Sequence, residues 1–182
     1  MSNLFDGLIT SKTRIKLLIR FFLNPDTRSY LRELSRECNV SSNAVREELN
    51  QLTKTKLLKS EKNGRQVYYR ANQDHPLFPE LKSMVGKLMG IDKVVENIVN
   101  RLGKLECAYL IDDYAEGKDS GIIDLLLVGD IDRYQLDDLT GKTERYIKRK
   151  IRTLVLTRDE FAGFGSAFND RPRLLIWEAE GK

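Results

Sequence analysis

The spacing of apolar residues in the first 55 positions predicts three helices. The first carries apolar side chains at i, i+3, i+4 and i+7 and ends before Pro25. A second, short helix follows with Ser29 as its expected N-cap, and the third begins at Ser41 or Ser42. The expected inward positions of the three helices are Ile15, Leu18, Ile19 and Phe22, then Leu31, Leu34 and Cys38, then Val45, Leu49 and Leu52.

Beyond the third helix the apolar period falls from about 3.6 to two. Residues 57–72 read as two strand-like runs around Asn63-Gly64, the strongest short-range signal for a β-hairpin. Residues 135–149 contain a predicted helix. Four apolar runs predict buried strands, namely LECAYLI, IIDLLLV, IRTLVL and RLLIW. Strands interleaved with helices indicate an α/β sheet in the second half of the chain.

Two amphipathic runs lie between the hairpin and the first of these strands. Pro76 and Pro79 close the first region, so we expect domains at 1–75 and 91–182, joined by a helical linker at 76–90. The second run is expected to cover the C-terminal sheet. The first run either pairs with a twofold mate in a homodimer or packs into the core, and both alternatives stay open. The runs carry Leu77, Leu81, Met84, Val85 and Leu88, then Ile91, Val94, Val95, Ile98, Val99 and Leu102.

Charge is distributed unevenly between the two regions. Residues 1–75 contain 14 Lys and Arg against 8 Asp and Glu, whereas residues 76–182 contain 17 against 19. The basic excess therefore lies in the N-terminal region, as expected for a polyanion-binding module, although a solvated basic surface is the alternative. No stretch approaches the roughly 20 apolar residues of a membrane helix, and the N-terminus has no basic start followed by an apolar run. We expect a cytoplasmic protein without a membrane partner.

Few residues are suited to metal or nucleophilic chemistry. Cys38 and Cys107 lie far apart within apolar patterns, so buried, reduced thiols are expected. His75 is the only histidine, and it stands beside the linker prolines. One histidine and two distant cysteines form no ordinary zinc cluster, and no nucleophile–His–acid arrangement can be built around His75. We expect no cofactor, no metal and no catalytic residue.

The stretch from Tyr30 to Arg70 combines several motifs in one order. A short helix is followed by a turn, VSSNAV, by the helix ending LNQL, and by the hairpin tip GRQVYY. On these motifs, residues 12–72 resemble the winged helix-turn-helix domain of ArsR-like bacterial transcriptional regulators. The resemblance implies binding to double-stranded DNA. The metal sensing of that family is not carried over, because the chain lacks the required cysteine and histidine cluster.

The polar face of the third helix supplies the candidate base contacts. Arg46 can pair with guanine edges, and Asn43 or Asn50 with adenine. The candidates for base reading are Ser42, Asn43, Arg46 and Asn50, and those for phosphate contact are Lys54, Lys59, Lys62, Arg65 and Arg70. Arg65 at the hairpin tip could also enter the minor groove. Glu47 and Glu48 dilute the positive potential, so a protein-binding module or a solvated face is the alternative.

Residues 112–129, DDYAEGKDSGIIDLLLVG, carry a second resemblance. Tyr114, Ala115 and Gly117 match an aromatic-Ala-x-Gly motif, and Asp124 begins an apolar strand that ends in Gly. The region 91–178 therefore resembles the minimal nucleotidyltransferase fold. The family pattern places Gly-Ser at 112–113, and a first aspartate at 122, where this chain has two aspartates and Ile122. A third family carboxylate normally lies on a later strand, and KIRTLVLT contains no acid.

These departures remove the chemistry that the resemblance implies. Carboxylates at Asp112 and Asp113 would repel phosphate, and Asp124 alone makes a poor magnesium site. A new metal site from Asp112, Asp113, Asp119 and Asp124 is the less favoured alternative to solvated loop acids. GFGSAF at 163–168 contains a further Gly-Ser pair, but its place after the strands indicates a flexible loop.

Together these patterns predict a two-domain α/β protein. We expect a cytoplasmic, homodimeric, sequence-specific DNA-binding regulator that is not an enzyme. Its degenerate nucleotidyltransferase-like domain would serve assembly, or sensing of an unknown nucleotide or small-molecule effector. The alternative is an active nucleotidyltransferase that uses the winged helix to dock a partner or a nucleic-acid substrate.

Overall fold

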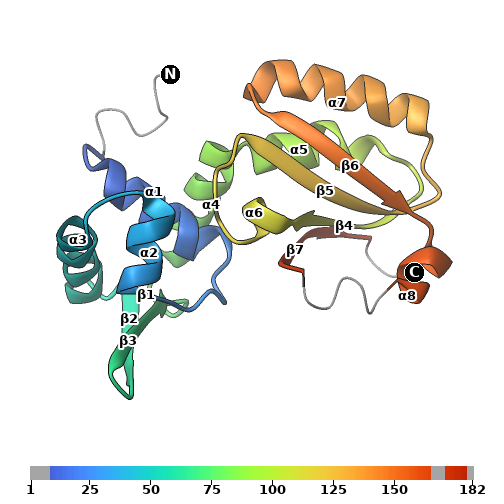
Figure 1. Ribbon diagram of the computed structural model, residues 1–182. Helices are drawn as coiled ribbons and strands as arrows, with labels where there is room; N and C mark the ends of the chain where they lie inside the picture. Colours follow the sequence, from blue (N-terminus) through green and yellow to red (C-terminus); the bar gives the residue numbers. More distant parts are fainter. Residues whose placement is uncertain (1–8, 165–170, 180–182) are drawn as a thin grey trace. The chain divides into compact units, whose positions relative to one another are not determined.

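The chain has an α/β architecture in two compact units, which divide between Leu88 and Met89 (Figure 1). The computed structural model describes residues 9–164 and 171–179. Within these ranges no helix combines the length and the apolar character needed to cross a bilayer.

The first unit is a winged helix-turn-helix. Its elements are α1 (Lys12–Leu23), β1 (Ser29–Tyr30), α2 (Leu31–Cys38), α3 (Ser42–Lys54), β2 (Leu58–Asn63), β3 (Gln66–Ala71) and α4 (Phe78–Met89). The three strands are antiparallel in the order β1-β3-β2. The β2–β3 hairpin turns at Gly64, whose φ of 59° is favoured by glycine, and at Arg65. The sequence prediction of three helices followed by a hairpin is confirmed.

Short polar side chains set where these helices begin. The Ser11 hydroxyl accepts a hydrogen bond from the Arg14 amide (3.2 Å), and the Ser41 hydroxyl caps α3 by accepting from the Ala44 amide (3.3 Å). The prediction that Ser29 caps α2 is wrong. Ser29 is buried in β1, where its hydroxyl accepts from Arg20 (3.2 Å) and is therefore committed to the core.

The core of the first unit joins α4 to the helix-turn-helix. Phe22 is fully buried, and its ring lies 5.7 Å from that of Phe78 at the start of α4. Val85 is also buried, whereas a second stripe of α4 is only partly covered. That stripe, which we call the α4 stripe, consists of Leu77, directly before the helix, and of Leu81, Met84 and Leu88 within it.

The second unit is a mixed sheet with helices on both faces. Its elements are α5 (Ile91–Asn97), the 3-10 helix η1 (Val99–Arg101), β4 (Leu105–Ile111), α6 (Asp112–Ala115), β5 (Ile122–Gly129), α7 (Arg133–Ile147), β6 (Lys150–Leu156), α8 (Arg158–Gly163) and β7 (Arg173–Glu178). The strand order is β6-β5-β4-β7, with β5 and β6 parallel and the other pairs antiparallel. Helices α5 and α7 lie on one side of the sheet, and α8 packs on the other (Figure 1).

Apolar residues fill the space on both sides of this sheet. On the α5 side, Val94 and Ile98 are fully buried, as expected for the second amphipathic run. On the α8 side, the Phe161 ring stacks on Tyr109 at 5.8 Å. The apolar cluster beneath it consists of Ile111, Leu126, Val128 and Leu156.

Two helices differ from the sequence prediction. Helix α7 begins at Arg133 because the Asp132 carboxylate accepts from the amides of Tyr134 (2.8 Å) and Gln135 (3.3 Å). Helix α8 was not predicted at all, although Thr157 and Glu160 form a capping box at its start. The loop prediction for GFGSAF falls largely on residues 165–168, which lie outside the described ranges.

Candidate functional site

The polar candidates on α3 form one continuous stripe. Ser42, Arg46, Asn50 and Lys54 recur every four residues, so that they share one side of the helix, and all four are exposed. Asn43 is exposed beside them. The opposite side of α3 is buried through Val45, Leu49 and Leu52. The structure therefore brings all four predicted base-reading residues, with Lys54, onto one solvent-facing surface, which we call the α3 surface.

Short polar contacts organise the N-terminal end of the α3 surface. Arg46 Nη1 donates to Asn43 Oδ1 (3.3 Å), which holds the guanidinium beside the amide. The Ser42 hydroxyl donates to the Ser35 hydroxyl of α2 (3.2 Å), and this bond ties the two helices of the motif together. The side chains of Ser42, Asn43 and Arg46 are exposed, so they can exchange such contacts for base edges.

The two glutamates of α3 have different surroundings. Glu48 accepts from Arg14 Nε of α1 at 2.7 Å, and its side chain is only 13% exposed. Gln51 also accepts a hydrogen bond from Arg14. The charge of Glu48 is thus balanced within the helical core, whereas Glu47 is exposed. Glu48 was expected to weaken the positive potential of this helix, but its negative charge is compensated by Arg14.

The hairpin separates the predicted phosphate contacts into two groups. Leu58 and Ala71 are buried, so the hairpin face that carries them packs on the helices, and by strand alternation Lys62 shares that face. Lys59 and Arg70 are cross-strand partners on the opposite face. Lys59 donates to Asp74 at 2.5 Å, and this hydrogen bond lowers the pKa of the Asp74 carboxyl.

Arg65 lies at the exposed hairpin turn, between the two strands. From the turn, the Arg65 side chain can reach toward either face of the hairpin. Lys62 and Arg65 are both exposed near the tip of the wing, while Lys59 and Arg70 form a separate group that is partly neutralised by Asp74.

The thiols and the histidine have ordinary structural surroundings. Both cysteines are free, Cys38 being buried and Cys107 half-buried. Burial raises the pKa of the Cys38 thiol. His75 Nδ1 accepts from the Leu77 amide (3.1 Å), which places the ring at the turn that leads into α4.

In the second unit, Asp112 stands where the nucleotidyltransferase pattern has glycine. Its φ is 57°, a left-handed conformation that glycine adopts without strain and that other residues adopt less readily. The aspartate thus adopts a backbone conformation typical of glycine while it carries a carboxylate. Arg171 binds that carboxylate with two donors, at 3.1 and 2.5 Å, and the hydrogen bond raises the pKa of the arginine.

Asp124, the remaining motif carboxylate, is held by an arginine from the neighbouring strand. The parallel register of β5 and β6 sets Arg152 directly beside Asp124. Arg152 donates from Nε (2.6 Å) and Nη2 (2.8 Å) to the two carboxylate oxygens. The aspartate side chain is 12% exposed and the arginine side chain 67%. A metal ion at Asp124 would have to displace this bidentate pair.

The other motif positions contribute to the core rather than to a ligand site. Tyr114 is fully buried, and its hydroxyl donates to Asp119 Oδ1 (2.6 Å). Burial and the nearby Asp119 raise the pKa of the Tyr114 hydroxyl. Arg149 adds two hydrogen bonds to Asp119, at 3.2 and 2.8 Å. Gly117 adopts a φ of 75° after α6, and Ile122 is half-buried at the start of β5.

Three of the four acidic residues weighed as a metal set are therefore bound to different arginines. Asp113 is exposed next to them. Within residues 9–164 and 171–179, no group of three or more His, Cys, Asp or Glu side chains is arranged to hold a metal ion. The arginines that bind these carboxylates are Arg171, Arg152 and Arg149.

These arginines were not predicted from the sequence. The strand expected to carry the third family carboxylate has Arg152 instead of an acid. This reversal of charge was the one feature of the sequence that could have indicated the Asp124–Arg152 pair. Arg149 and Arg171 lie 30 and 59 positions away from their partners in the chain, so no local pattern indicates them.

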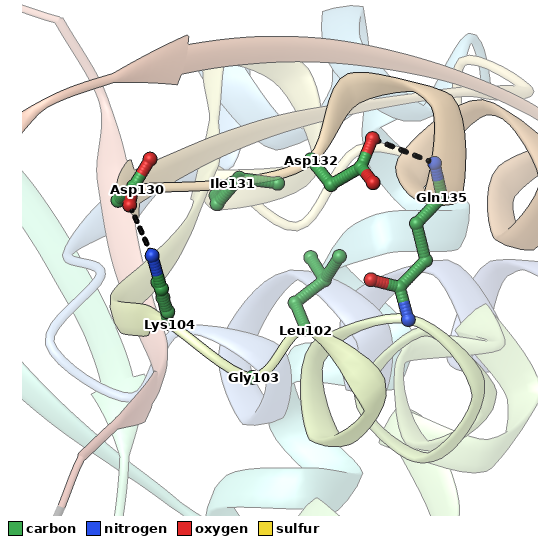
Figure 2. A pocket seen from close by; sticks show the side chains of 7 residues that line it. All are labelled: Leu102, Gly103, Lys104, Asp130, Ile131, Asp132 and Gln135. Atoms are coloured by element: carbon green, nitrogen blue, oxygen red, sulfur yellow. Dashed lines mark hydrogen bonds and ion pairs between the residues drawn. The ribbon is translucent and has the colours of Figure 1, made fainter.

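A cavity of about 320 Å³ lies where β5 leads into α7 (Figure 2). Figure 2 shows Lys104 reaching Asp130, at 2.6 Å, and Asp132 directed at the amide of Gln135. The two carboxylates of this cavity are thus engaged by a lysine and by the helix cap. We call it the β5–α7 cavity. It lies at the end of β5 opposite to Asp124.

Comparison with protein families and with curated proteins gives no match. Three solved structures are similar to parts of the chain. Reduced HlyU from Vibrio cholerae is 23% identical over 44% of this chain and 77% of its own, with a TM-score of 0.36. A protein from Sulfolobus solfataricus proposed to be a nucleotidyltransferase is 21% identical over 50% and 78%, with a TM-score of 0.33.

The third similar structure is ZitR from Lactococcus lactis in complex with DNA. It is 17% identical over 50% of this chain and 63% of its own, with a TM-score of 0.35. Similarities of this size assign no function to the chain. Its two-part architecture follows from its own strand order and helix spacing.

Proposed function

We propose that this chain is a sequence-specific DNA-binding transcriptional regulator that acts in the cytoplasm as a homodimer. The observation that carries the proposal is the α3 surface, on which four polar side chains face solvent at four-residue intervals beside a basic wing tip. A helix of this kind can lie in the major groove while the wing meets the backbone. The basic excess of residues 1–75 favours a polyanionic partner.

The α4 stripe supports the dimeric part of the proposal. Leu77 is 55% exposed, and Leu81, Met84 and Leu88 are half-buried along the same side of the helix. An isologous contact through such a stripe would present two copies of α3 to inverted half-sites, about one helical turn apart or a multiple of it.

Selection from a random duplex pool with the purified full chain tests DNA recognition. We expect enrichment of an inverted repeat, bound at least 10³-fold more tightly than random duplex at physiological salt. Failure to enrich any sequence, with the protein folded by circular dichroism, would contradict the proposal.

We further propose that the second unit is a nucleotidyltransferase-like scaffold without transfer activity, serving assembly or sensing. Support comes from the Asp124–Arg152 pair, which uses both oxygens of the carboxylate that a metal would need. The exposed Asp113 carboxylate adds repulsion at the position of phosphate binding in the nucleotidyltransferase pattern, whereas the charge of Asp112 is compensated by Arg171.

Incubation with labelled nucleoside triphosphates and magnesium or manganese tests for transfer. We expect no label on protein, RNA or small-molecule acceptors, either for the wild type or for Ile122→Asp, because Arg152 remains beside Asp124. Label transfer by the wild type that is lost in Asp124→Ala would favour the alternative function, an active nucleotidyltransferase docked through its winged helix.

A further inference from the structure

A second cavity of the second unit, of about 290 Å³, lies between α7 and the α5–η1 segment. On one wall, Lys93 and Asn97 share one side of α5, and Arg101 of η1 lines the same wall. The other wall is one side of α7, with residues at i, i+3, i+4 and i+7. These are Leu139, Lys142, Thr143 and Tyr146. We call this the α5–α7 cavity.

The charge of the α5–α7 cavity distinguishes it from the β5–α7 cavity. Its lining contains three cationic side chains and no carboxylate, whereas the β5–α7 cavity has two carboxylates and one lysine. Cations gathered around a concave surface create a positive potential that attracts anions. The cationic residues are Lys93, Arg101 and Lys142.

The carboxylates that pair with the two lysines lie outside the residues that line the cavity, and these ion pairs can be exchanged for a ligand. Lys93 binds Glu96 and Lys142 binds Asp138, each at 2.6 Å. All four side chains are between 32% and 61% exposed, and ion pairs of this kind contribute little to stability. An anionic ligand can therefore take over the ammonium groups at low cost.

Tyr146 adds a flat surface to this cationic cavity. Tyr146 is 69% exposed, which is unusual for a residue with a large aromatic ring. The Lys93 ammonium lies 5.8 Å from the centroid of that ring. Leu139 is buried at the floor, and the buried Thr143 hydroxyl donates to the Leu139 carbonyl (2.8 Å). The floor is thus apolar and saturated in its hydrogen bonds, while the rim is cationic and aromatic.

We infer that the α5–α7 cavity binds a small phosphorylated ligand that carries a planar ring, of the size of a nucleoside monophosphate. Phosphate oxygens would accept from the two lysines and Arg101, and the ring would stack on Tyr146. The volume is at the lower end of ligand pockets, which suits a ligand of this size. The cavity lies on the α5 and α7 side of the sheet, and Asp124 belongs to the α8 side.

This inference specifies a ligand class for the sensing role proposed for the second unit. Ligand binding itself does not depend on the proposed function; only an effect of the ligand on DNA binding does. Ligand binding is therefore measured directly, by calorimetry on the full chain, without DNA. The probes are the four ribonucleoside monophosphates, the matching nucleosides, and ribose 5-phosphate, so that phosphate and ring are tested apart. We expect the monophosphates to bind at least about tenfold more tightly than either partial ligand.

Three variants and one control locate the site. Arg101→Ala and Lys142→Ala should each weaken monophosphate binding by about tenfold or more, because each removes a charge-assisted hydrogen bond. Tyr146→Ala should weaken the monophosphates and leave ribose 5-phosphate unchanged. Lys104→Ala is the matched control, since Lys104 is also an exposed, ion-paired lysine but lines the β5–α7 cavity.

Absence of monophosphate binding at millimolar concentration, or equal affinity in Lys142→Ala and Lys104→Ala, would overturn the inference. Equal affinity for ribose 5-phosphate and the monophosphates would also overturn it, because the ring would then have no role. DNA affinity is measured separately with the selected duplex. A chain that binds the monophosphates but no DNA would retain this site and lose the regulator proposal.

Discussion

The α3 surface and the Asp112–Asp124 end of the second unit both gather polar side chains, but they use them in opposite ways. On α3, Arg46 and Asn50 face solvent, and the Arg46 contact to Asn43 is a long one at 3.3 Å. In the second unit, Asp124 and Asp112 are each bound by two donors of one arginine.

The difference separates residues that can bind a partner from residues that hold the fold. An exposed, weakly satisfied side chain loses little when it changes its hydrogen-bond partner. A carboxylate in a bidentate arginine pair must first lose a charge-assisted interaction. Each prediction below tests whether recognition resides in the first unit and structural support in the second.

The largest expected effect comes from the α4 stripe. Met84→Asp combined with Leu88→Asp should convert the dimer to a monomer, because charges would enter an apolar contact. The affinity for an inverted repeat should then fall by about 10²–10⁴-fold through loss of bivalency. Analytical ultracentrifugation and DNA titration measure the two effects, with Lys82→Ala as the control on an exposed position of α4. A wild type that is already monomeric at micromolar concentration would remove the prediction.

Arg46→Ala should have the next largest effect. Loss of a bidentate guanine contact should cost about 1–3 kcal/mol in binding to the selected duplex and should relax its sequence preference. Arg28→Ala is the matched control, because the Arg28 guanidinium stacks on Tyr68 at 4.7 Å and pairs with Glu61. Equal losses on selected and random duplexes would show that Arg46 reads no base.

Tyr114→Phe tests the second half of the comparison. It removes the hydroxyl by which the buried Tyr114 donates to Asp119 at the edge of the core, so the free energy of unfolding should fall by about 1–2 kcal/mol. DNA affinity should stay unchanged. Urea denaturation and DNA titration measure the two quantities. A drop in DNA affinity with unaltered stability would contradict the assignment of this network to structural support.

The smallest expected effect distinguishes the two groups of basic residues on the hairpin. Arg65→Ala should weaken binding to all sequences alike and reduce the slope of log affinity against log salt by about one. Arg70→Ala should change the slope less, because Arg70 lies on the other face of the hairpin with Lys59 and Asp74. Equal changes for the two variants would place both faces in contact with DNA.

Much of the fold was readable from the sequence because its signals are local. The four-residue spacing of Val45 and Leu49 defines the buried side of α3, and Asn63-Gly64 marks the hairpin turn. The departures of Asp112, Asp113 and Ile122 from the nucleotidyltransferase pattern are also visible in the sequence itself. The helix spacing and the hairpin turn depend on backbone period or turn chemistry within about ten residues.

The tertiary structure alone decided which side chains meet. Arg152 lies beside Asp124 only because β5 and β6, separated by α7, pair in one particular parallel register. Lys59 and Lys62 are three positions apart, and strand alternation puts them on opposite faces of the hairpin. Strand register, and the face on which each side chain lies, are fixed by burial of apolar residues far along the chain. The sequence therefore determined the elements, while long-range packing determined the ion pairs and which polar side chains share a surface.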